Sequence, residues 1–400
     1  MKNFIFISPH FPSSYWRFCD ALKERGFNVL GIGDAPYNEV SEECKNALTE
    51  YYLCVDMDKF ENEKKAVEYY KEKYGDIDYL ESNNEYWLEK DAMLREIFDV
   101  ANGPRPTEIN RYKFKSVQKE FYEKAGLKTA RYCLTHNDDE VIEFSKKVGF
   151  PIFAKPDNGV GAQDTHKFKN IEDLQGFLQN RDRNVTYIIE EYVDGMIVSF
   201  DGITDSHADV IFYTNNVFIN DNAEIVANQL DDLYYCIPGE KVDPILVDMG
   251  KRALKAMEVK NRFFHLEFFV LKSDHPYLGK KGTIVPLEAN LRPAGGYTPD
   301  LINFANSTNC YEIYADSIAY DENRQYNHPE KFYAGAPSRR NAYNYAHSLD
   351  EVFEKYREHI CFYGEYPKVL RDDMGDSFVM AKFKTLDELF EFDKFYREKK

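Results

Sequence analysis

The chain has 400 residues, 43% of them hydrophobic and 30% charged, a composition typical of a globular protein with about two or three domains. Its formal net charge of -18 argues against a general nucleic-acid binder or a membrane-surface protein, although it allows a local basic pocket for a phosphorylated ligand. The cysteines form no CxxC pair and no apolar run approaches a membrane span, which predicts reduced thiols in the cytoplasm and no membrane partner.

The first part of the chain follows the pattern of an open parallel sheet. Residues 3–10 predict a buried strand, residues 13–26 a helix that begins at a serine and ends at a glycine, and residues 27–34 a second strand. Such a strand–helix–strand unit opens a doubly wound sheet. Residues 82–100 predict a long helix, and the breaker-rich segment NGPRPTEIN, residues 102–110, marks a first domain boundary.

The remainder mixes helices with strands. Residues 151–168 predict a strand, a glycine-containing loop and a second strand, and residues 196–226 predict short antiparallel strands. A last strand-and-helix module begins near residue 331. The other predicted helices span residues 111–127, 138–150, 170–181, 247–259 and 309–321, and the other predicted strands span residues 186–193, 262–271 and 282–291.

Two apolar strands carry carboxylates. Glu288 and Asn290 are two residues apart and project from one face of their strand, and Glu267 is ringed by large apolar residues on the preceding strand. If the strands pair, Glu267 lies beside Glu288, and the two carboxylates repel unless a cation or proton joins them. Two carboxylates and an amide oxygen are ligands that suit Mg²⁺. From these strands alone, a half-exposed sheet with outward glutamates stays open.

Lys155 ends an apolar strand just before a loop that contains Gly159 and Gly161. A loop of this kind closes over phosphates while a lysine supplies charge, but no P-loop or dinucleotide signature is present, and an ordinary turn is the alternative. The strand that ends in EEYV, residues 190–193, can present backbone groups to an adenine edge or simply run out to solvent.

The order of these pieces resembles the ATP-grasp superfamily of carboxylate–amine ligases, with an N-terminal domain similar to that of biotin carboxylase and of the large subunit of carbamoyl-phosphate synthase. The resemblance extends to about residue 320, and LEANLRPAGG, residues 287–296, is its most specific part. It implies an α/β and α+β fold in four parts. These are a doubly wound domain (1–107), two α+β subdomains that clasp ATP (108–192 and 193–330) and a small C-terminal α+β module (331–400).

The resemblance implies a role in ATP binding for the basic and glycine-rich segments. Lys115 and Lys155 would contact the phosphates, and the loop with Gly159 and Gly161 would fold over them. Lys113 competes with Lys115 for this role. Adenine would be held by Glu190 and by the backbone of Glu191, Tyr192 and Val193.

The resemblance also implies the metal site and the reaction. Glu267, Glu288 and Asn290 would hold Mg²⁺ or Mn²⁺, and Arg292 would steady the transferred phosphoryl group. A carboxylate would attack the γ-phosphate to give an acyl phosphate and ADP, and an amine would then displace phosphate to form an amide or peptide bond. The alternatives are an ATP-grasp carboxylase or kinase with another acceptor, and a nucleotide-binding regulatory module without turnover.

Some positions depart from the family pattern or stay open. Ile197 stands where many relatives carry a glutamate that binds ribose. Asp201, which is close in the sequence, is a candidate for the ribose contact instead. His265 lies two residues before Glu267, and we expect it to be a buried histidine with hydrogen-bond partners inside the protein. A contact with substrate is the alternative. Arg339 and Arg340 either pair with a substrate carboxylate or lie on the surface. The expected partners are small carboxylate and amine substrates, with amino acids among them, and a second copy of the chain in a homodimer.

Overall fold

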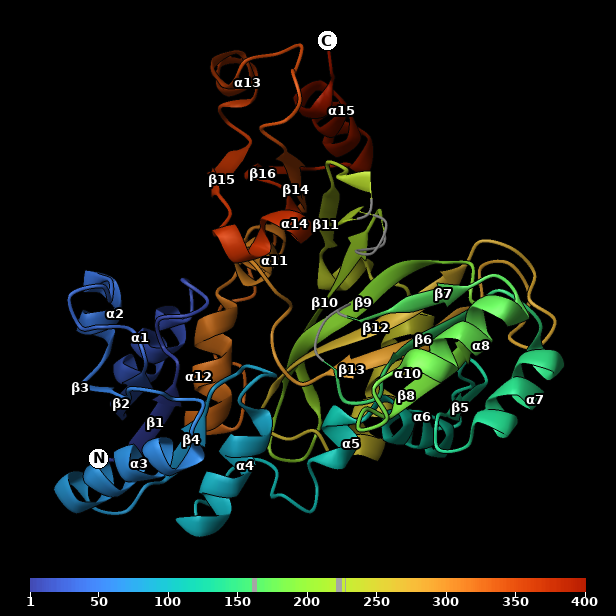
Figure 1. Ribbon diagram of the computed structural model, residues 1–400. Helices are drawn as coiled ribbons and strands as arrows, with labels where there is room; N and C mark the ends of the chain where they lie inside the picture. Colours follow the sequence, from blue (N-terminus) through green and yellow to red (C-terminus); the bar gives the residue numbers. More distant parts are fainter. Residues whose placement is uncertain (160–163, 221–224, 227) are drawn as a thin grey trace.

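The computed structural model describes residues 1–159, 164–220, 225–226 and 228–400, and its strands form three sheets (Figure 1). None of the helices in these ranges has the length and apolar character needed to span a membrane.

The N-terminal sheet is parallel, with strand order β3–β2–β1–β4. Because β2 lies on one side of β1 and β4 on the other, the loops after β1 and β4 border the crevice in which sheets of this kind bind ligands. The strands are β1 (Asn3–Ile7), β2 (Asn28–Gly33), β3 (Glu50–Leu53) and β4 (Tyr79–Glu81), and the helices are α1 (Trp16–Glu24), α2 (Glu42–Ala47), α3 (Phe60–Tyr74) and α4 (Leu88–Ile97).

The helix predicted over residues 82–100 is wrong at its start, since α4 begins only at Leu88. The side chain of Ser82 donates to Asp91 Oδ2 at 2.6 Å and also accepts from the backbone of Asn84 at 3.1 Å. These local bonds compete with helical backbone bonds and hold the segment as a loop. The loop brings Glu85 to the carboxyl edge of the sheet.

The second sheet is antiparallel, with order β5–β8–β6–β7, and buries a small core that includes Val141, Ile152, Leu174 and Ile189. Its strands are β5 (Tyr132–Leu134), β6 (Ile152–Pro156), β7 (His166–Phe168) and β8 (Tyr187–Glu191). The helices of this region are α5 (Asn110–Lys113), α6 (Lys115–Lys124), α7 (Asp138–Val148) and α8 (Ile171–Asn180).

The third sheet is antiparallel throughout, with order β13–β12–β9–β10–β11–β14–β16–β15. Its strands are β9 (Gly195–Thr204), β10 (Val210–Phe218), β11 (Leu233–Ile237), β12 (Phe263–Leu271), β13 (Ile284–Asn290), β14 (Tyr333–Arg339), β15 (Ile360–Glu365) and β16 (Ser377–Phe383). The helices are α10 (Pro244–Met257), α11 (Thr298–Asn306), α12 (Cys310–Tyr320), α13 (Leu349–Tyr356), α14 (Arg371–Met374) and α15 (Leu386–Arg397), with short 3₁₀ turns at Gly239–Lys241 and Lys368–Leu370.

The C-terminal strands do not form a sheet of their own. β14 pairs with β11, so that Leu233 lies opposite Pro337 and Cys236 opposite Ala334. The boundary predicted at residue 330 therefore falls within one continuous sheet, and the four-part division of the chain stays a prediction.

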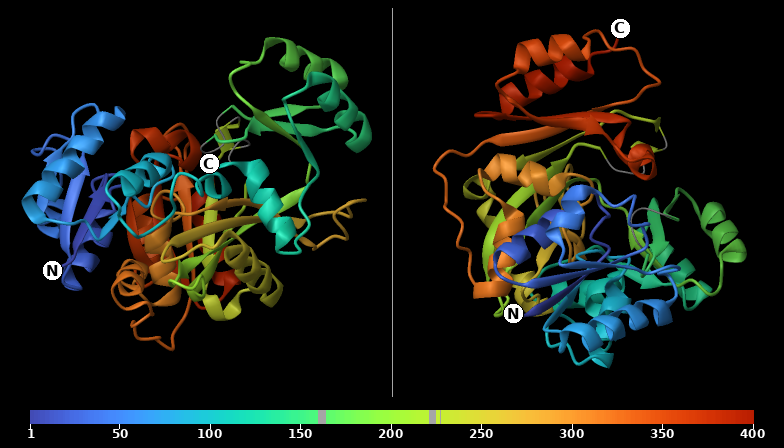
Figure 2. Two further views of the ribbon diagram at one scale, coloured as in Figure 1. Left: turned by 90° about the horizontal axis from the view of Figure 1, so that it is seen from below. Right: turned by 90° about the vertical axis from the view of Figure 1, so that its left-hand side faces the viewer.

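The N-terminal sheet and the second sheet lie on opposite sides of the third (Figure 1 and Figure 2). The N-terminal domain is anchored to α12 by Arg25, which follows α1 and contacts Asp316 at 2.8 Å and Glu312 at 3.1 Å. These contacts lie between the end of α1 and the start of β2, and they fix the N-terminal domain to α12.

Candidate active site

β12 and β13 pair as expected from the sequence and bring the carboxylates together. Glu267 lies opposite Glu288, and His265 lies opposite Asn290, so all four side chains project from one face of the sheet. The Glu267 and Glu288 side chains are 24% and 17% exposed, which leaves both within reach of a ligand.

Lys115 contacts Glu288 of this pair. Its Nζ lies 3.1 Å from Glu288 Oε1 and donates to Gly159 O at 2.8 Å. Lys113, the competing choice, donates instead to Glu85 O at 3.3 Å. Lys115 is therefore the lysine that lies with the carboxylates and with the glycine loop. Gly161 belongs to the residues outside the described ranges.

Glu190 is paired to two lysines. Its carboxylate lies 2.6 Å from Lys119 Nζ and 2.9 Å from Lys155 Nζ. Burial on its own would raise the pKa of Glu190, but the two ammonium groups hold it at about 2. The same burial would lower the pKa of Lys155, yet Glu190 and Glu288 raise it. In this structure the Glu190 side chain thus keeps Lys155 charged and in place.

Lys119 was missed by sequence reasoning. It lies four residues after Lys115 on α6, a spacing that puts both side chains on one helix face, and this spacing is a signal that could have found it. Its side chain is only 2% exposed.

The segment predicted to hold adenine begins inside the second sheet. The Glu191 side chain accepts from Arg131 N at 2.7 Å and from Arg131 Nε at 2.8 Å, and the Glu191 backbone N–H donates to Arg131 O. Tyr192 stacks on Phe153, and Val193 is buried in a small apolar cluster. The Glu191 amide is therefore used within the protein, and adenine binding by Glu190 and by the backbone of Glu191, Tyr192 and Val193 stays a prediction.

Arg292 has a carboxylate partner from the N-terminal domain. Its Nη2 and Nε donate to Glu85 Oε2 at 3.0 and 3.3 Å, and its Nη1 donates to Pro293 O at 2.9 Å. Burial alone would lower the pKa of Arg292, but Glu85 and Glu267 raise it. Sequence reasoning missed Glu85 because it was assigned to the interior of a helix.

His265 links the site to a buried carboxylate. Its Nδ1 lies 2.7 Å from Asp201 Oδ1, and its Nε2 lies 3.2 Å from Glu267 Oε1. Burial would lower the pKa of His265, but these two carboxylates raise it to about 10. Asp201 also accepts from Asn216 Nδ2 at 2.9 Å and from Ser199, and it is fully buried. The suggestion that Asp201 contacts ribose is therefore wrong.

Arg339 and Arg340 are neither surface charges nor neighbours of the carboxylates. They are 7% and 5% exposed and donate to backbone carbonyls. Arg339 bonds to Tyr396 O, and Arg340 bonds to Leu230 O at 2.8 Å. Both arginines stabilise the C-terminal part of the third sheet.

The donor set fits Mg²⁺ or Mn²⁺. Glu267, Glu288 and Asn290 supply oxygen donors from one face of two paired strands, and such ions complete their coordination with phosphate and water oxygens. Within the described residues no group of three or more His, Cys, Asp or Glu side chains is placed to hold a metal. The three oxygen donors leave coordination positions open for the oxygens of a phosphorylated ligand.

Comparisons with known proteins agree with this architecture. No protein-family model matches the chain. A segment of 108 residues is 32% identical to a phosphoribosylamine–glycine ligase of Clostridium acetobutylicum, and the match covers 25% of this chain and 26% of that protein. The chain spans no more than 63% of the length of three curated relatives that it matches.

Solved structures match over nearly the whole chain. An L-amino acid ligase from Bacillus licheniformis superposes with a TM-score of 0.71 at 14% identity and covers 98% of this chain and 96% of its own. The biotin carboxylase domain of a Hydrogenobacter thermophilus 2-oxoglutarate carboxylase, solved with MgADP, superposes with a TM-score of 0.68 at 14% identity and covers 98% and 89%.

A doubly wound domain followed by two α+β units around paired carboxylates defines a class of fold. The chain has the fold of the ATP-grasp proteins, with a biotin-carboxylase-like N-terminal domain, which it shares with the similar L-amino acid ligase and biotin carboxylase domain. The resemblance and the fold class predicted from the sequence are thereby confirmed.

Proposed function

We propose that this chain is an ATP-dependent carboxylate–amine ligase, which forms an amide or peptide bond through an acyl phosphate and releases ADP and phosphate. The observation that carries the proposal is one cluster of charges, in which the Glu267–Glu288 pair faces Lys115, Lys155 and Arg292. Phosphoryl transfer needs positioning and charge neutralisation more than covalent help, and this cluster is suited to supply both.

Each residue of the cluster would bind a different part of the MgATP complex or of the acyl phosphate. Glu267, Glu288 and Asn290 would hold Mg²⁺ or Mn²⁺, and the ion supplies neutralisation of phosphate charge when bound. Lys115 and Lys155 would donate to the ATP phosphates, beside Gly159 and the adjoining loop. Arg292 would donate to the γ-phosphoryl oxygens and then to the acyl phosphate. Adenine would lie at the end of β8, against the backbone of Tyr192 and Val193.

Amino acids are the substrates that the site favours. The Arg292 guanidinium and the Glu85 carboxylate are in contact at 3.0 Å, so the crevice presents both signs of charge side by side. An amino acid carries a carboxylate that can pair with Arg292 and an ammonium group that can pair with Glu85. The name of the similar Bacillus licheniformis protein, an L-amino acid ligase, supports the same substrate class.

The proposal is tested by a screen of amino acids and small carboxylic acids for ADP release, with mass detection of the product. Hydroxylamine in place of the amine should give a hydroxamate when the right carboxylate is present. AMP and pyrophosphate as the products would contradict the acyl-phosphate route and the role of Arg292. A carboxylase or kinase would release ADP without an amide product, and a regulatory module would bind nucleotide without turnover.

The cellular location and the assembly of the chain are also part of the proposal. All seven cysteines, which lie in the described part of the chain, are unpaired thiols, and this supports the cytoplasm as the location. A homodimer is supported by the similar biotin carboxylase domain of Hydrogenobacter thermophilus, which was solved as a dimer. Size-exclusion chromatography with light scattering would test the dimer.

A further inference from the structure

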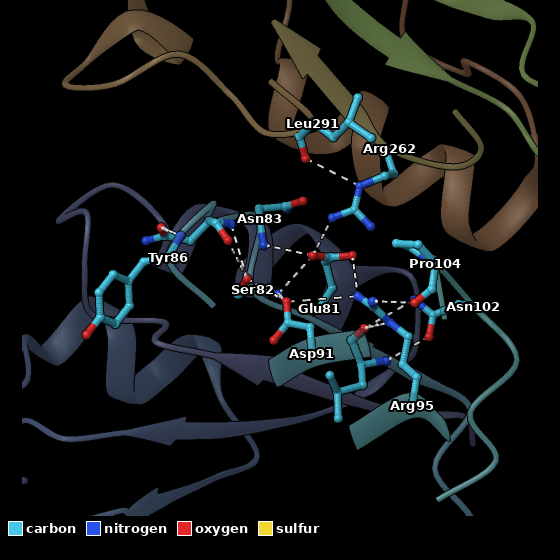
Figure 3. Close-up of polar contacts among 12 residues, drawn as sticks. Glu81, Ser82, Asn83, Tyr86, Asp91, Arg95, Asn102, Pro104, Arg262 and Leu291 are labelled. Atoms are coloured by element: carbon cyan, nitrogen blue, oxygen red, sulfur yellow. Dashed lines mark hydrogen bonds and ion pairs between the residues drawn. The ribbon is translucent and has the colours of Figure 1, made fainter. Parts of the chain in front are cut away.

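A buried cluster of charges joins the N-terminal domain to the third sheet (Figure 3). At its centre, Glu81 at the end of β4 accepts from Arg95 Nη2 at 2.8 Å and from Arg262 Nη2 at 2.7 Å. Arg95 lies on α4 of the same domain, whereas Arg262 directly precedes β12. The Glu81–Arg262 contact therefore spans the two domains.

The cluster is sealed from water. The side chains of Glu81, Asp91, Arg95 and Arg262 are each at most 3% exposed. Glu81 lies between the two guanidinium groups, and its Oε1 also accepts from Ser82 N and Asn83 N at 3.1 Å. Because a buried charge needs its partner, a displacement between the domains that broke this contact would leave the Arg262 guanidinium without its carboxylate.

Arg262 also contacts the segment that carries the proposed chemistry. Its Nε donates to Leu291 O at 3.3 Å. Leu291 lies between Asn290, a proposed metal ligand, and Arg292, the proposed phosphoryl-binding residue. Arg262 itself is fixed to β9, since its backbone bonds to Thr204. The Arg262 guanidinium thus connects Glu81 of the N-terminal domain with Leu291, which lies between two residues of the candidate site.

A second contact connects the same two segments. Arg292 bonds to Glu85, which lies four residues after Glu81 in the loop between β4 and α4. Residues 81–85 and residues 290–292 are therefore joined at two points, through Arg262 and through Arg292. Both points must hold for Asn290 and Arg292 to keep their place relative to the crevice of the N-terminal sheet.

We propose that Arg262, held by Glu81, is a positioning residue of the active site, which fixes residues 290–292 against the N-terminal domain without touching substrate. The inference rests on the proposed function for its kinetic consequence. Lysine at position 262 keeps the charge opposite Glu81, but it lacks the planar fork that reaches both Glu81 and Leu291 O. Arg95 offers a matched control, because it contacts the same Glu81 and no residue of the 290–292 segment.

The experiment compares Arg262→Lys with Arg95→Lys by hydrogen exchange and by kinetics. For Arg262→Lys we expect faster amide exchange at Leu291 and Arg292 and a kcat lower by about 10- to 100-fold, with KM for MgATP close to wild type, because the lysines that hold ATP are untouched. For Arg95→Lys we expect wild-type exchange at these amides and a kcat near that of the wild type.

A second matched pair covers the case in which Arg262→Lys does not fold. Glu81→Gln and Asp91→Asn are isosteric changes in the same cluster, and only Glu81 contacts Arg262. Glu81→Gln should loosen residues 290–292 and lower kcat, whereas Asp91→Asn should do neither. Wild-type exchange and kcat in both Arg262→Lys and Glu81→Gln would overturn the inference, as would equal losses in the two control variants.

Failure of the proposed function gives a different result. If the wild-type protein forms no product with any substrate tried, the proposed ligase activity fails, while the exchange at Leu291 and Arg292 still decides whether Arg262 positions this segment.

Discussion

Each carboxylate of the candidate site has its own cation. Glu288 contacts Lys115, Glu267 contacts the His265 ring, and Glu190 lies between Lys119 and Lys155. In a partly buried site, these pairs offset the cost of burying charge and hold the side chains in one geometry. ATP phosphates would then compete with carboxylates for the same lysines, so binding exchanges one anion for another.

Removal of one carboxylate tests the metal assignment. Glu288→Gln should lower ATP turnover by roughly 100-fold or more, because it weakens binding of the ion and leaves phosphate charge uncompensated. Steady-state ADP release at several Mg²⁺ concentrations measures this, and excess Mg²⁺ should restore part of the rate. Glu391→Gln, at an exposed position of α15, is the control. Wild-type turnover in both Glu288→Gln and Glu267→Gln would rule out the metal site.

A buried glutamate on α3 should make stability depend on pH. Glu63 has no hydrogen-bond partner for either oxygen among the described residues, and Lys90 Nζ lies 3.7 Å away. Burial raises the pKa of Glu63 from 4.5 to about 8. Between these values the folded protein binds more protons than the unfolded chain, so the free energy of unfolding falls as the pH rises through this window.

Glu63→Gln should remove this contribution and make the protein more stable than wild type at pH 8. Urea unfolding of both proteins between pH 5 and pH 8 measures the difference, with Glu72→Gln at an exposed position of the same helix as the control. A constant difference between Glu63→Gln and wild type across this range would contradict the prediction.

Some residues of the site were predictable because strand geometry is local. Residues two apart on a strand share a face, so Glu288 and Asn290 could be placed from spacing alone. The partners of Glu190 and Arg292 could not, because Lys119 and Glu85 come from other elements and only the tertiary fold brings them there. For Arg339 the sequence allowed a substrate contact or a surface position, and the structure shows neither. Its partner Tyr396 O is distant along the chain, so the neighbouring residues do not indicate this bond.

At the scale of elements, β13 is an edge strand whose outer side is bonded to a helix. The side chain of Gln118 on α6 donates to Ala289 O at 2.8 Å and accepts from Ala289 N at 3.0 Å. One amide side chain thus replaces a neighbouring strand at the residue between Glu288 and Asn290. It satisfies backbone groups that would otherwise be buried without partners.

Gln118→Leu should therefore destabilise the protein by about 1–3 kcal/mol, since it leaves the Ala289 N–H and C=O unpaired. Turnover should fall as well, because the same strand carries the proposed metal ligands. Denaturant unfolding and ADP release measure the two effects, and Glu120→Gln on the exposed side of α6 is the control. Unchanged stability would show that water can replace the Gln118 amide.

The elements themselves were more predictable than their sheets. The periodicity of residues 262–271 and 282–291 indicated strands that the structure contains as β12 and β13. The helix over 82–100 failed at its start because Ser82 bonds to Asp91 through its side chain, and hydrophobic periodicity carries no information on such a bond. The pairing of β11 with β14 could not be predicted from the sequence either, since β11 ends at Ile237 and β14 begins only at Tyr333.

At the scale of the molecule, the third sheet runs without a break from the strands of the candidate site to the C-terminal strands. A chain that ends at residue 330 would lose β14, β15 and β16 and expose the edge of β11 together with buried residues such as Leu233 and Tyr235. We expect this truncated chain to aggregate or to unfold without a cooperative transition, as seen by size-exclusion chromatography and circular dichroism. A soluble 1–330 chain with wild-type ADP release would contradict this expectation.

The burial of the cations in the site has a kinetic consequence. The side chains of Lys115, Lys155 and Arg292 are only 4%, 16% and 21% exposed, whereas the chain as a whole carries a net charge of -18. An anionic nucleotide that approaches from a distance therefore meets a repulsive field before it reaches the attraction of the lysines. Added salt screens the long-range repulsion more than the short-range contacts inside the site. Stopped-flow measurements should show that the rate constant for nucleotide association rises as salt is first added. Electrostatic attraction at long range would instead make this rate constant fall with added salt.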